Sequence, residues 1–179
     1  MDKEFSKRVR SNFEQFFREK HPEWKLASGS KNTPPGWRLY ERRLSENSPD
    51  TKAYILLMVD AQHNRFVIDI AINDTGDIPP WQPFPPISEA TTNNRFPLAL
   101  LWGGKVGFDW RLSDSGPLLS IQSAANISEE LLEFKKREIE EFRKSSNLLL
   151  DTYCTDAFEK INTYALPFFE RVAHKAQNP

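Results

Sequence analysis

Two runs of β-branched and aromatic residues decide the fold of this chain: Ala53–Asp60, AYILLMVD, and Arg65–Asn73, RFVIDIAIN. Only the short link AQHN separates them, which is typical of a β-hairpin. The second run alternates, and one of its faces carries Phe66, Ile68, Ile70 and Ile72. Its other face carries Arg65, Asp69 and Asn73 with Val67 and Ala71. The first run is apolar on both faces, as in a central strand that is covered on two sides. The hairpin therefore marks the position of the core.

The chain before the hairpin predicts one helix and one more strand. Residues 2–20 carry an apolar stripe at helical spacing, made of Phe5, Val9, Phe13, Phe16 and Phe17. Pro22 disfavours helical backbone at the preceding residue and ends this helix. Trp24 and Leu26 are expected to pack just beyond it. Residues 37–44 predict a charged strand near an edge, so that three consecutive strands form an antiparallel meander.

A proline-rich segment, IPPWQPFPPI, follows at residues 78–87. Its prolines exclude helix and interior strand and favour an extended polyproline path. Trp81 and Phe84 are three residues apart, one turn of such a helix, and project on the same side. We expect them to dock on the domain's own sheet; the alternative is that they present two rings to a partner.

The last half of the chain predicts short elements followed by two helices. Residues 97–102 suit a strand or a helical turn, and Gly103-Gly104 ends it. Residues 106–112 and 118–121 are expected to be strands. One helix begins at a cap at Asn126 or Ser128, with an apolar stripe of Leu132, Ile139, Phe142, Leu149, Leu150 and Tyr153. A second helix is expected from Thr155 to Ala176, kinked or divided by Pro167, with Cys154 between the two.

Composition favours one domain over residues 1–179 and a reducing compartment. The formal net charge is −1, and the single cysteine, Cys154, allows no intrachain disulfide. The mean hydropathy is −0.61, and no apolar run approaches the roughly 20 residues of a membrane-spanning helix. We therefore expect a cytoplasmic protein without a membrane segment.

A search for catalytic and cofactor motifs predicts none of them. His21, His63 and His174 are far apart and have no second ligand at metal-binding spacing. The glycines near Lys105 fail the phosphate-loop pattern at two positions. Asp60 and Asp69 are placed like the acids of a nuclease core, but Ala71 stands where that signature needs a lysine. Catalytic residues, cofactor and metal are thus all expected to be absent.

The first third of the chain is basic, with eleven Lys or Arg against six Asp or Glu in residues 1–43. Such an asymmetry can mark a nucleic-acid face. Its candidates are Arg38, Arg42 and Arg43 with Lys3, Lys7 and Arg10. The simpler interpretation is a helix and an edge strand with solvated cationic faces. We expect no nucleic-acid binding at physiological salt.

The order helix, meander, Arg95-Phe-Pro segment, Trp102, Trp110 and paired helices ending in Leu166-Pro-Phe-Phe169 resembles small bacterial domains of unassigned function. Some proteins of similar size and make-up are immunity proteins, which neutralise a toxin. The resemblance covers most of the chain as architecture, and it assigns no residue a role.

The predicted fold is a single α+β domain. It contains an antiparallel meander sheet of about four or five strands, packed mainly on one face by an N-terminal helix and two C-terminal helices. The predicted function is a non-catalytic protein-interaction module of a bacterial cell, immunity-like or a subunit of a larger system. Its candidate partner-binding residues are Trp81, Phe84, Arg38, Arg42 and Arg43. The alternative is an enzyme or nucleic-acid binder that works through unpatterned Arg and Asp residues.

Overall fold

The predicted hairpin lies at the centre of the sheet. A computed structural model describes residues 2–27, 36–44, 51–74, 78–79, 94–105, 107–112 and 129–177. Strands β3 (Lys52–Asp60) and β4 (Arg65–Asn73) pair antiparallel along their whole length. Leu57 lies opposite Ile68, and Ile55 lies opposite Ile70. The predicted hairpin is therefore confirmed, with these four side chains on one face.

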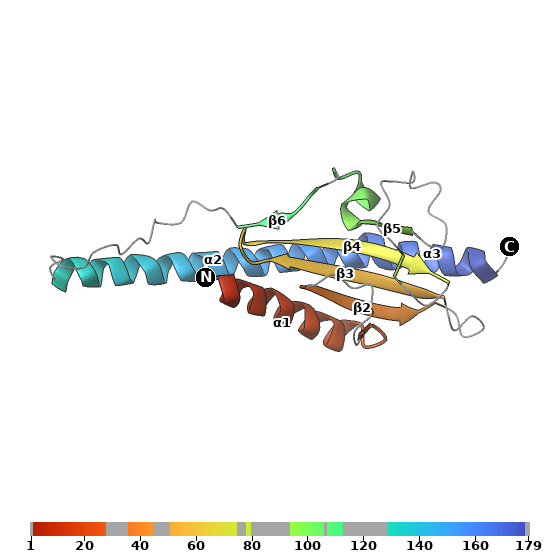
Figure 1. Cartoon of the computed structure of the whole chain (residues 1–179), viewed down its shortest axis with the longest axis horizontal. Coiled ribbons are helices and arrows are strands. Elements are labelled where there is room, and N and C mark those ends of the chain that lie inside the picture. The colour runs from red at the N-terminus through yellow and green to blue at the C-terminus, as the bar shows by residue number, and fades with distance from the viewer. Residues whose placement is uncertain are drawn as a thin grey trace.

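Four more strands complete a six-stranded antiparallel sheet (Figure 1). They are β1 (Lys25–Leu26), β2 (Trp37–Arg43), β5 (Asn94–Pro97) and β6 (Trp110–Arg111). The strand order is β1-β2-β3-β4-β5, and β6 pairs with the part of β4 that β5 leaves open. The meander β2-β3-β4 is confirmed. Strands β1 and β5 were not predicted, because two and four residues are too few to show a periodic pattern.

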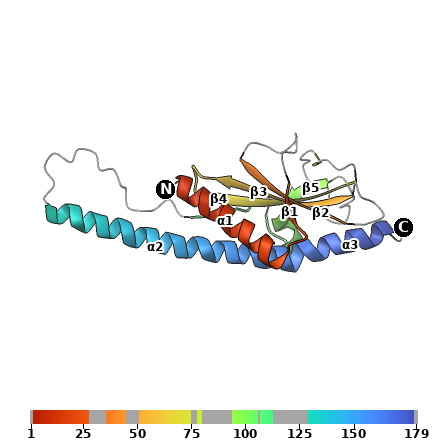
Figure 2. The same ribbon diagram turned by 90° about the horizontal axis from the view of Figure 1, so that it is seen from below.

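The α-helices cover one face of this sheet, which makes the fold α+β as predicted (Figure 2). They are α1 (Asp2–Lys20), α2 (Glu129–Lys160) and α3 (Leu166–Gln177). Their apolar side chains share one core with the alternating face of β4. Burial of this continuous apolar surface is the main favourable term for folding.

The Phe stripe of α1 is buried as predicted, and its rings contact both the sheet and α2. Phe13 lies 5.7 Å from Phe66 and 4.9 Å from Phe158, measured between ring centroids. Trp24 is also buried beyond the helix end, at 3% exposure. The matching prediction for Leu26 is wrong. Its side chain is 44% exposed because β1 is an edge strand.

The opposite face of the sheet carries a second, smaller apolar cluster made of Leu39, Tyr54, Leu56, Ala71 and Ile78. An ion pair is buried on the same side, where Nε and Nη2 of Arg95 lie 3.0 and 2.9 Å from Oδ2 of Asp69. The Arg95 guanidinium also lies 4.5 Å from the ring centroid of Trp37. The polar face predicted for β4 is therefore not a solvated one.

The predicted boundary between the two C-terminal helices is wrong, because α2 continues through Cys154 to Lys160. The interruption is a π-helical turn, η4 (Ile161–Ala165), directly before α3. Pro167 has no N–H, and its ring collides with the carbonyl four residues earlier in a regular helix. The N–H of Leu166 bonds the carbonyl of Ile161 instead, five residues earlier. Pro167 thus bends the helix as predicted, one turn before its own position (Figure 2).

The N-terminal part of α2 extends beyond the sheet (Figure 1). Leu150 is buried as predicted, but Leu149 is 39% exposed. The prediction for Leu149 is wrong because the helix leaves the sheet at this point. The side chains of Leu132, Ile139 and Phe142 lie outside the described residues.

Between β5 and β6 the chain forms one helical turn, η2 (Leu98–Trp102), so the helical alternative was the correct one. Gly103 ends it with a φ of +79°. The strand expected over residues 106–112 is only the two residues of β6, because Gly107 has a φ of +81°. The strand expected at 118–121 lies outside the described residues.

Candidate protein-binding site

The three predicted arginines do not form one cationic surface. Arg38 and Arg42 point to the helical side of the sheet, where Nη2 of Arg38 lies 3.8 Å from a carboxylate oxygen of Glu14. Arg42 contacts Glu170 at 2.5 Å and Glu23 at 3.9 Å. Arg43 is exposed and, one residue further along the strand, points to the opposite face.

Trp81 and Phe84 lie outside the described residues, so the role predicted for them stays a prediction. The start of their segment is described: Ile78 is 3% exposed and packs in the second cluster. At least the first residue of the proline-rich segment therefore docks on the domain's own sheet.

A cluster of four aromatic rings lies where η2, β6 and the end of α2 meet, and we call it the ring cluster. Trp102 is its centre, with ring centroids 5.6 Å from Phe108, 6.4 Å from Trp110 and 5.8 Å from Tyr164. Phe108 also meets Trp110 edge-on at 4.9 Å and 89°. Edge-to-face contacts of this kind are attractive beyond the area that they bury. The rings therefore hold one another in place.

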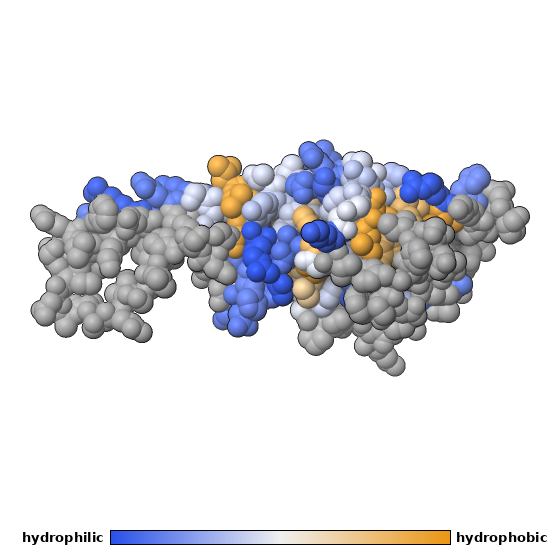
Figure 3. Space-filling model, turned by 90° about the horizontal axis from the view of Figure 1, so that it is seen from above, coloured by the Kyte–Doolittle hydropathy of each residue, from blue (hydrophilic) through white to orange (hydrophobic). Residues whose placement is uncertain are grey.

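The ring cluster reaches the surface. Phe108 is 39% exposed, Trp102 and Tyr164 are partly exposed, and Trp110 is buried. Leu149, also 39% exposed, lies seven residues before Asp156 of α2 and so on the same side of that helix. Figure 3 shows hydrophobic residues that reach the molecular surface in separate patches between hydrophilic ones.

The turn after η2 fixes the position of Trp102. A Cβ on Gly104 would lie 2.8 Å from the carbonyl oxygen of Ala99 and 3.0 Å from Nε1 of Trp102. The first distance is shorter than real Cβ atoms adopt and the second is tighter than most, so a side chain at this position would force the turn and the indole apart. The same residue donates its N–H to Ala99 at 2.9 Å. The backbone at Gly104 therefore packs directly against the indole of Trp102.

One hydrogen bond joins the buried ring of Trp110 to α2. Nε1 of Trp110 donates to Oδ2 of Asp156 at 2.8 Å. Lys160 lies one helical turn further on, 3.9 Å from the same carboxylate, with its Nζ 5.4 Å from the ring centroid of Trp102 and 5.8 Å from that of Tyr164. An ammonium group over aromatic faces is attracted by their quadrupoles. Lys160 therefore places a positive charge beside the rings of Trp102 and Tyr164.

A network of ion pairs joins the cluster to the hairpin link. Asp109 accepts from Arg65 at 3.1 Å and from Arg111 at 2.8 Å. Asp60 accepts from Nδ1 of His63 at 2.8 Å and from Nε of Arg65 at 3.0 Å. Burial alone would raise the pKa of Asp60, but the bonds from His63 and Arg65 lower it to about 2. His63 and Asp60 thus bond each other within the turn that links β3 and β4.

An open groove of about 560 Å³ runs between α1 and α2. Its polar groups bond one another: both oxygens of Asp151 accept from Arg8, at 3.2 and 2.6 Å, and one also accepts from Asn12 at 3.2 Å. Cys154 lies at its floor, and burial raises the pKa of the thiol to about 11. A thiol is a poor nucleophile. Cys154 therefore acts as a buried small side chain and not as a nucleophile in this groove.

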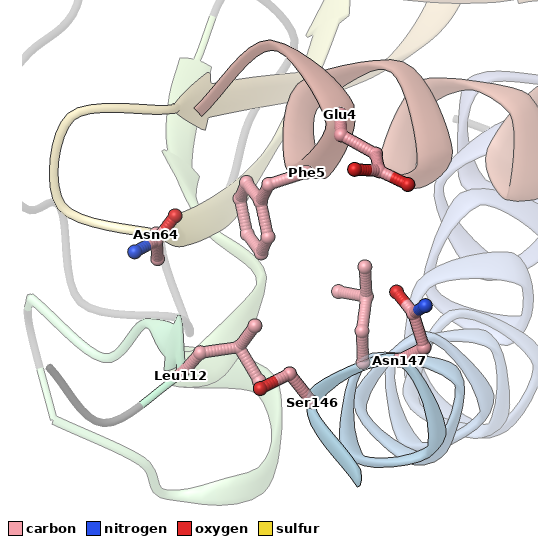
Figure 4. Close-up of a pocket in the computed structure, with 7 residues that line it drawn as sticks. Glu4, Phe5, Asn64, Leu112, Ser146 and Asn147 are labelled. Atoms are coloured by element: carbon pink, nitrogen blue, oxygen red, sulfur yellow. The ribbon is translucent and has the colours of Figure 1, made fainter. Parts of the chain in front are cut away.

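A second pocket, of about 40 Å³, lies where α2 leaves the sheet (Figure 4). Phe5, Leu112 and Leu150 form its apolar lining, and Asn64 and Asn147 lie at its rim. It has room for about one water molecule. This pocket is too small for a substrate, since ligand sites measure roughly 300–1,000 Å³.

Sequence reasoning missed the ring cluster as a site. Trp102, Phe108 and Trp110 were visible as neighbouring aromatics, but Tyr164 is more than fifty positions away and joins them only through the fold. The one usable signal was the density of rings around the three glycines of residues 103–107.

In the described parts of the chain, no group of three or more His, Cys, Asp or Glu could hold a metal ion. No described helix is both long and apolar enough to cross a bilayer.

Comparisons of this chain with protein-family models, with curated proteins and with solved structures found no match.

Proposed function

We propose that the chain is a non-catalytic protein-interaction module that binds its partner through the ring cluster. Its setting in this proposal is the cytoplasm of a bacterial cell, where it acts as an immunity-like protein or as a subunit of a larger system. The observation that carries the proposal is the exposure of Phe108, 39%, beside the partly exposed rings of Trp102 and Tyr164.

Two properties of the ring cluster support this role. Tryptophan and tyrosine are enriched among the residues that dominate binding energy at protein interfaces. The rings are also held rigidly by Gly104 and by the bond from Trp110 to Asp156. A preorganised surface loses little conformational freedom on binding.

The catalytic alternative has less support. The carboxylate of Asp151 in the α1–α2 groove is already bonded to Arg8 and Asn12. The thiol of Cys154 stays protonated at neutral pH, because burial raises its pKa to about 11. General acid–base or nucleophilic catalysis needs a group with an accessible proton or lone pair near the working pH.

The nucleic-acid alternative is weakened by the pairing of the predicted arginines. Arg38 contacts Glu14, and Arg42 contacts Glu23 and Glu170. Phosphate binding would need these guanidinium groups to exchange one anionic partner for another. We therefore keep the protein-binding proposal alone.

The test replaces one exposed apolar residue inside the ring cluster and one far from it. Phe108→Ser removes the exposed ring, and Leu26→Ser is the matched control on β1, where the side chain is 44% exposed. Capture from the native host is expected to identify a partner with the wild type. Phe108→Ser is expected to weaken binding by about 30-fold, as loss of a central interface residue does. Its melting temperature is expected to fall only slightly, because Phe108 loses its edge-on contacts with Trp102 and Trp110 but is partly exposed.

Two results would reject the proposal. One is a Phe108→Ser protein that binds the captured partner as tightly as the Leu26→Ser protein. The other is a double variant, Trp81→Ala with Phe84→Ala, that loses the partner at unchanged melting temperature while Phe108→Ser keeps it. That result would place the site in the proline-rich segment.

A further inference from the structure

We infer that the ring cluster takes an acidic segment of its partner, one in which carboxylates flank an apolar side chain. This inference rests on the proposed function and names the chemistry of the partner at the same site. It follows from the charged groups that contact or adjoin the rings in the described part of the chain: two lysines, and two carboxylates that already have internal partners.

The carboxylates next to the rings are already engaged. Asp109 accepts from Arg65 and Arg111, and Asp156 accepts from the indole of Trp110 and faces Lys160. An incoming cation would have to compete with these internal donors. A basic partner is therefore disfavoured at this surface.

The ammonium groups of the two nearby lysines, in contrast, can each accept a further anionic partner. Lys105 is exposed, is three residues before Phe108, and forms no ion pair with any residue that the structure describes. The nearest oxygen of Asp156 lies 3.9 Å from Nζ of Lys160, at the limit of an ion pair. Within the described ranges, Lys105 thus has no anionic partner, and Lys160 has one distant partner in Asp156.

Both lysines lie on segments that carry the exposed rings. Lys160 lies over Trp102 and Tyr164, and the carbonyl of Lys105 accepts the N–H of Phe108 at 3.1 Å, so the backbone of Lys105 belongs to the same turn as the exposed ring. A segment with an apolar side chain between carboxylates would cover Phe108 and Trp102 and reach both lysines. Such charge complementarity steers association and suppresses partners of the wrong sign.

The experiment uses the ¹⁵N-labelled full chain and three short synthetic peptides. Their repeats are Glu-Glu-Phe, Gln-Gln-Phe and Lys-Lys-Phe, so that only the charge differs. The readout is the indole N–H resonance of Trp102, assigned from its loss in Trp102→Phe. Lys105→Glu tests the charge at the site, and Lys25→Glu is the control at an exposed lysine of the distant β1.

The Glu-Glu-Phe peptide is expected to shift the Trp102 resonance and leave the buried indole of Trp24 unmoved. Its affinity is expected to fall when salt rises from about 0.02 to about 0.5 M, because screening weakens exposed charge pairs. Lys105→Glu is expected to weaken it by about three- to tenfold, the range of one or two surface charge contacts, and Lys25→Glu is expected to leave it unchanged.

The inference is overturned if the Gln-Gln-Phe or Lys-Lys-Phe peptide binds as tightly as the acidic one, or if the acidic peptide leaves Trp102 unmoved. Should Phe108→Ser still abolish capture of the native partner in that case, the proposed function stands and only the acidic preference falls. Should capture survive Phe108→Ser as well, both fall together.

Discussion

Replacing Arg95 by methionine is expected to destabilise the protein far more than any exposed arginine would. The side chains of Arg95 and Asp69 are 9% and 8% exposed, and both contacts of the guanidinium, at 3.0 and 2.9 Å, go to the same oxygen. Methionine keeps much of the volume but leaves the carboxylate buried without a partner. Breaking a buried pair in this way costs about 3–5 kcal/mol.

That loss converts to a drop in melting temperature of about 6–20 °C for a domain of this size. Thermal unfolding followed by circular dichroism measures it. Arg38→Met is the matched control, because Arg38 is 39% exposed and its contact to Glu14 is 3.8 Å long; we expect it to cost less than about 1 kcal/mol. Arg95→Met combined with Asp69→Leu is expected to recover most of the stability, since no charge is then buried.

The pH dependence gives an independent check. Burial raises the pKa of Asp69, and Arg95 opposes that rise. Without Arg95 the folded-state pKa rises further above the unfolded value, so the native state of the variant binds the proton more tightly. The stability deficit of Arg95→Met is therefore expected to shrink as the pH falls from 7 toward 4. This reasoning would be refuted if the Arg95→Met and Arg38→Met proteins had the same melting temperature at pH 7.

Three more predictions concern the core, the hairpin link and the cysteine. Ile68→Asp places an unpaired charge at a site that is 3% exposed and is expected to cost several kcal/mol; an unchanged melting temperature would contradict the central position of the hairpin. Asp60→Asn is expected to lower stability at pH 7. Because folding lowers the pKa of Asp60 to about 2, this difference from wild type should vanish as the pH falls from about 4 through about 2, and a difference that persists there would reject the network. Cys154 is expected to resist iodoacetamide at pH 8 until the protein is unfolded, because its thiol is buried and its pKa is raised to about 11; rapid alkylation of the native protein would show otherwise.

The sheet could be predicted where the pattern is long. Phe66, Ile68, Ile70 and Ile72 alternate without interruption, and a shift of one residue would turn all four to the other face. The register of β4 was therefore implied by its sequence. Strand β1 has only two residues, which cannot show alternation, and it exists because β2 offers an open edge.

The C-terminal helices show why boundaries are harder to predict than elements. Pro167 was recognised as a disruption, but its steric effect falls on the preceding turn, so the change of path lies at Ile161–Ala165. Leu149 fits the apolar stripe by spacing and is nevertheless exposed. Periodicity shows which side of a helix is apolar, but not where the sheet beneath it ends.

The ring cluster shows why a binding site is harder to predict from the sequence than a strand or a helix. Its geometry depends on Tyr164, whose position follows from the packing of α2 and η4, and on Gly104, whose need for a bare Cα appears only in three dimensions. The charge of the first third of the chain was visible in the sequence. Its ion pairs with Glu14, Glu23 and Glu170 were not, because they join segments that are distant along the chain.

Site-specific photocrosslinking tests the central claim, that a protein partner binds at the ring cluster, most directly. A photoreactive phenylalanine analogue replaces Phe108 in one protein and Leu26, the exposed apolar residue of β1, in another. Both proteins are irradiated in lysate of the native host. We predict a discrete crosslinked product from position 108 that is absent from position 26. A product from position 26 with none from position 108 would contradict the assignment of the binding surface.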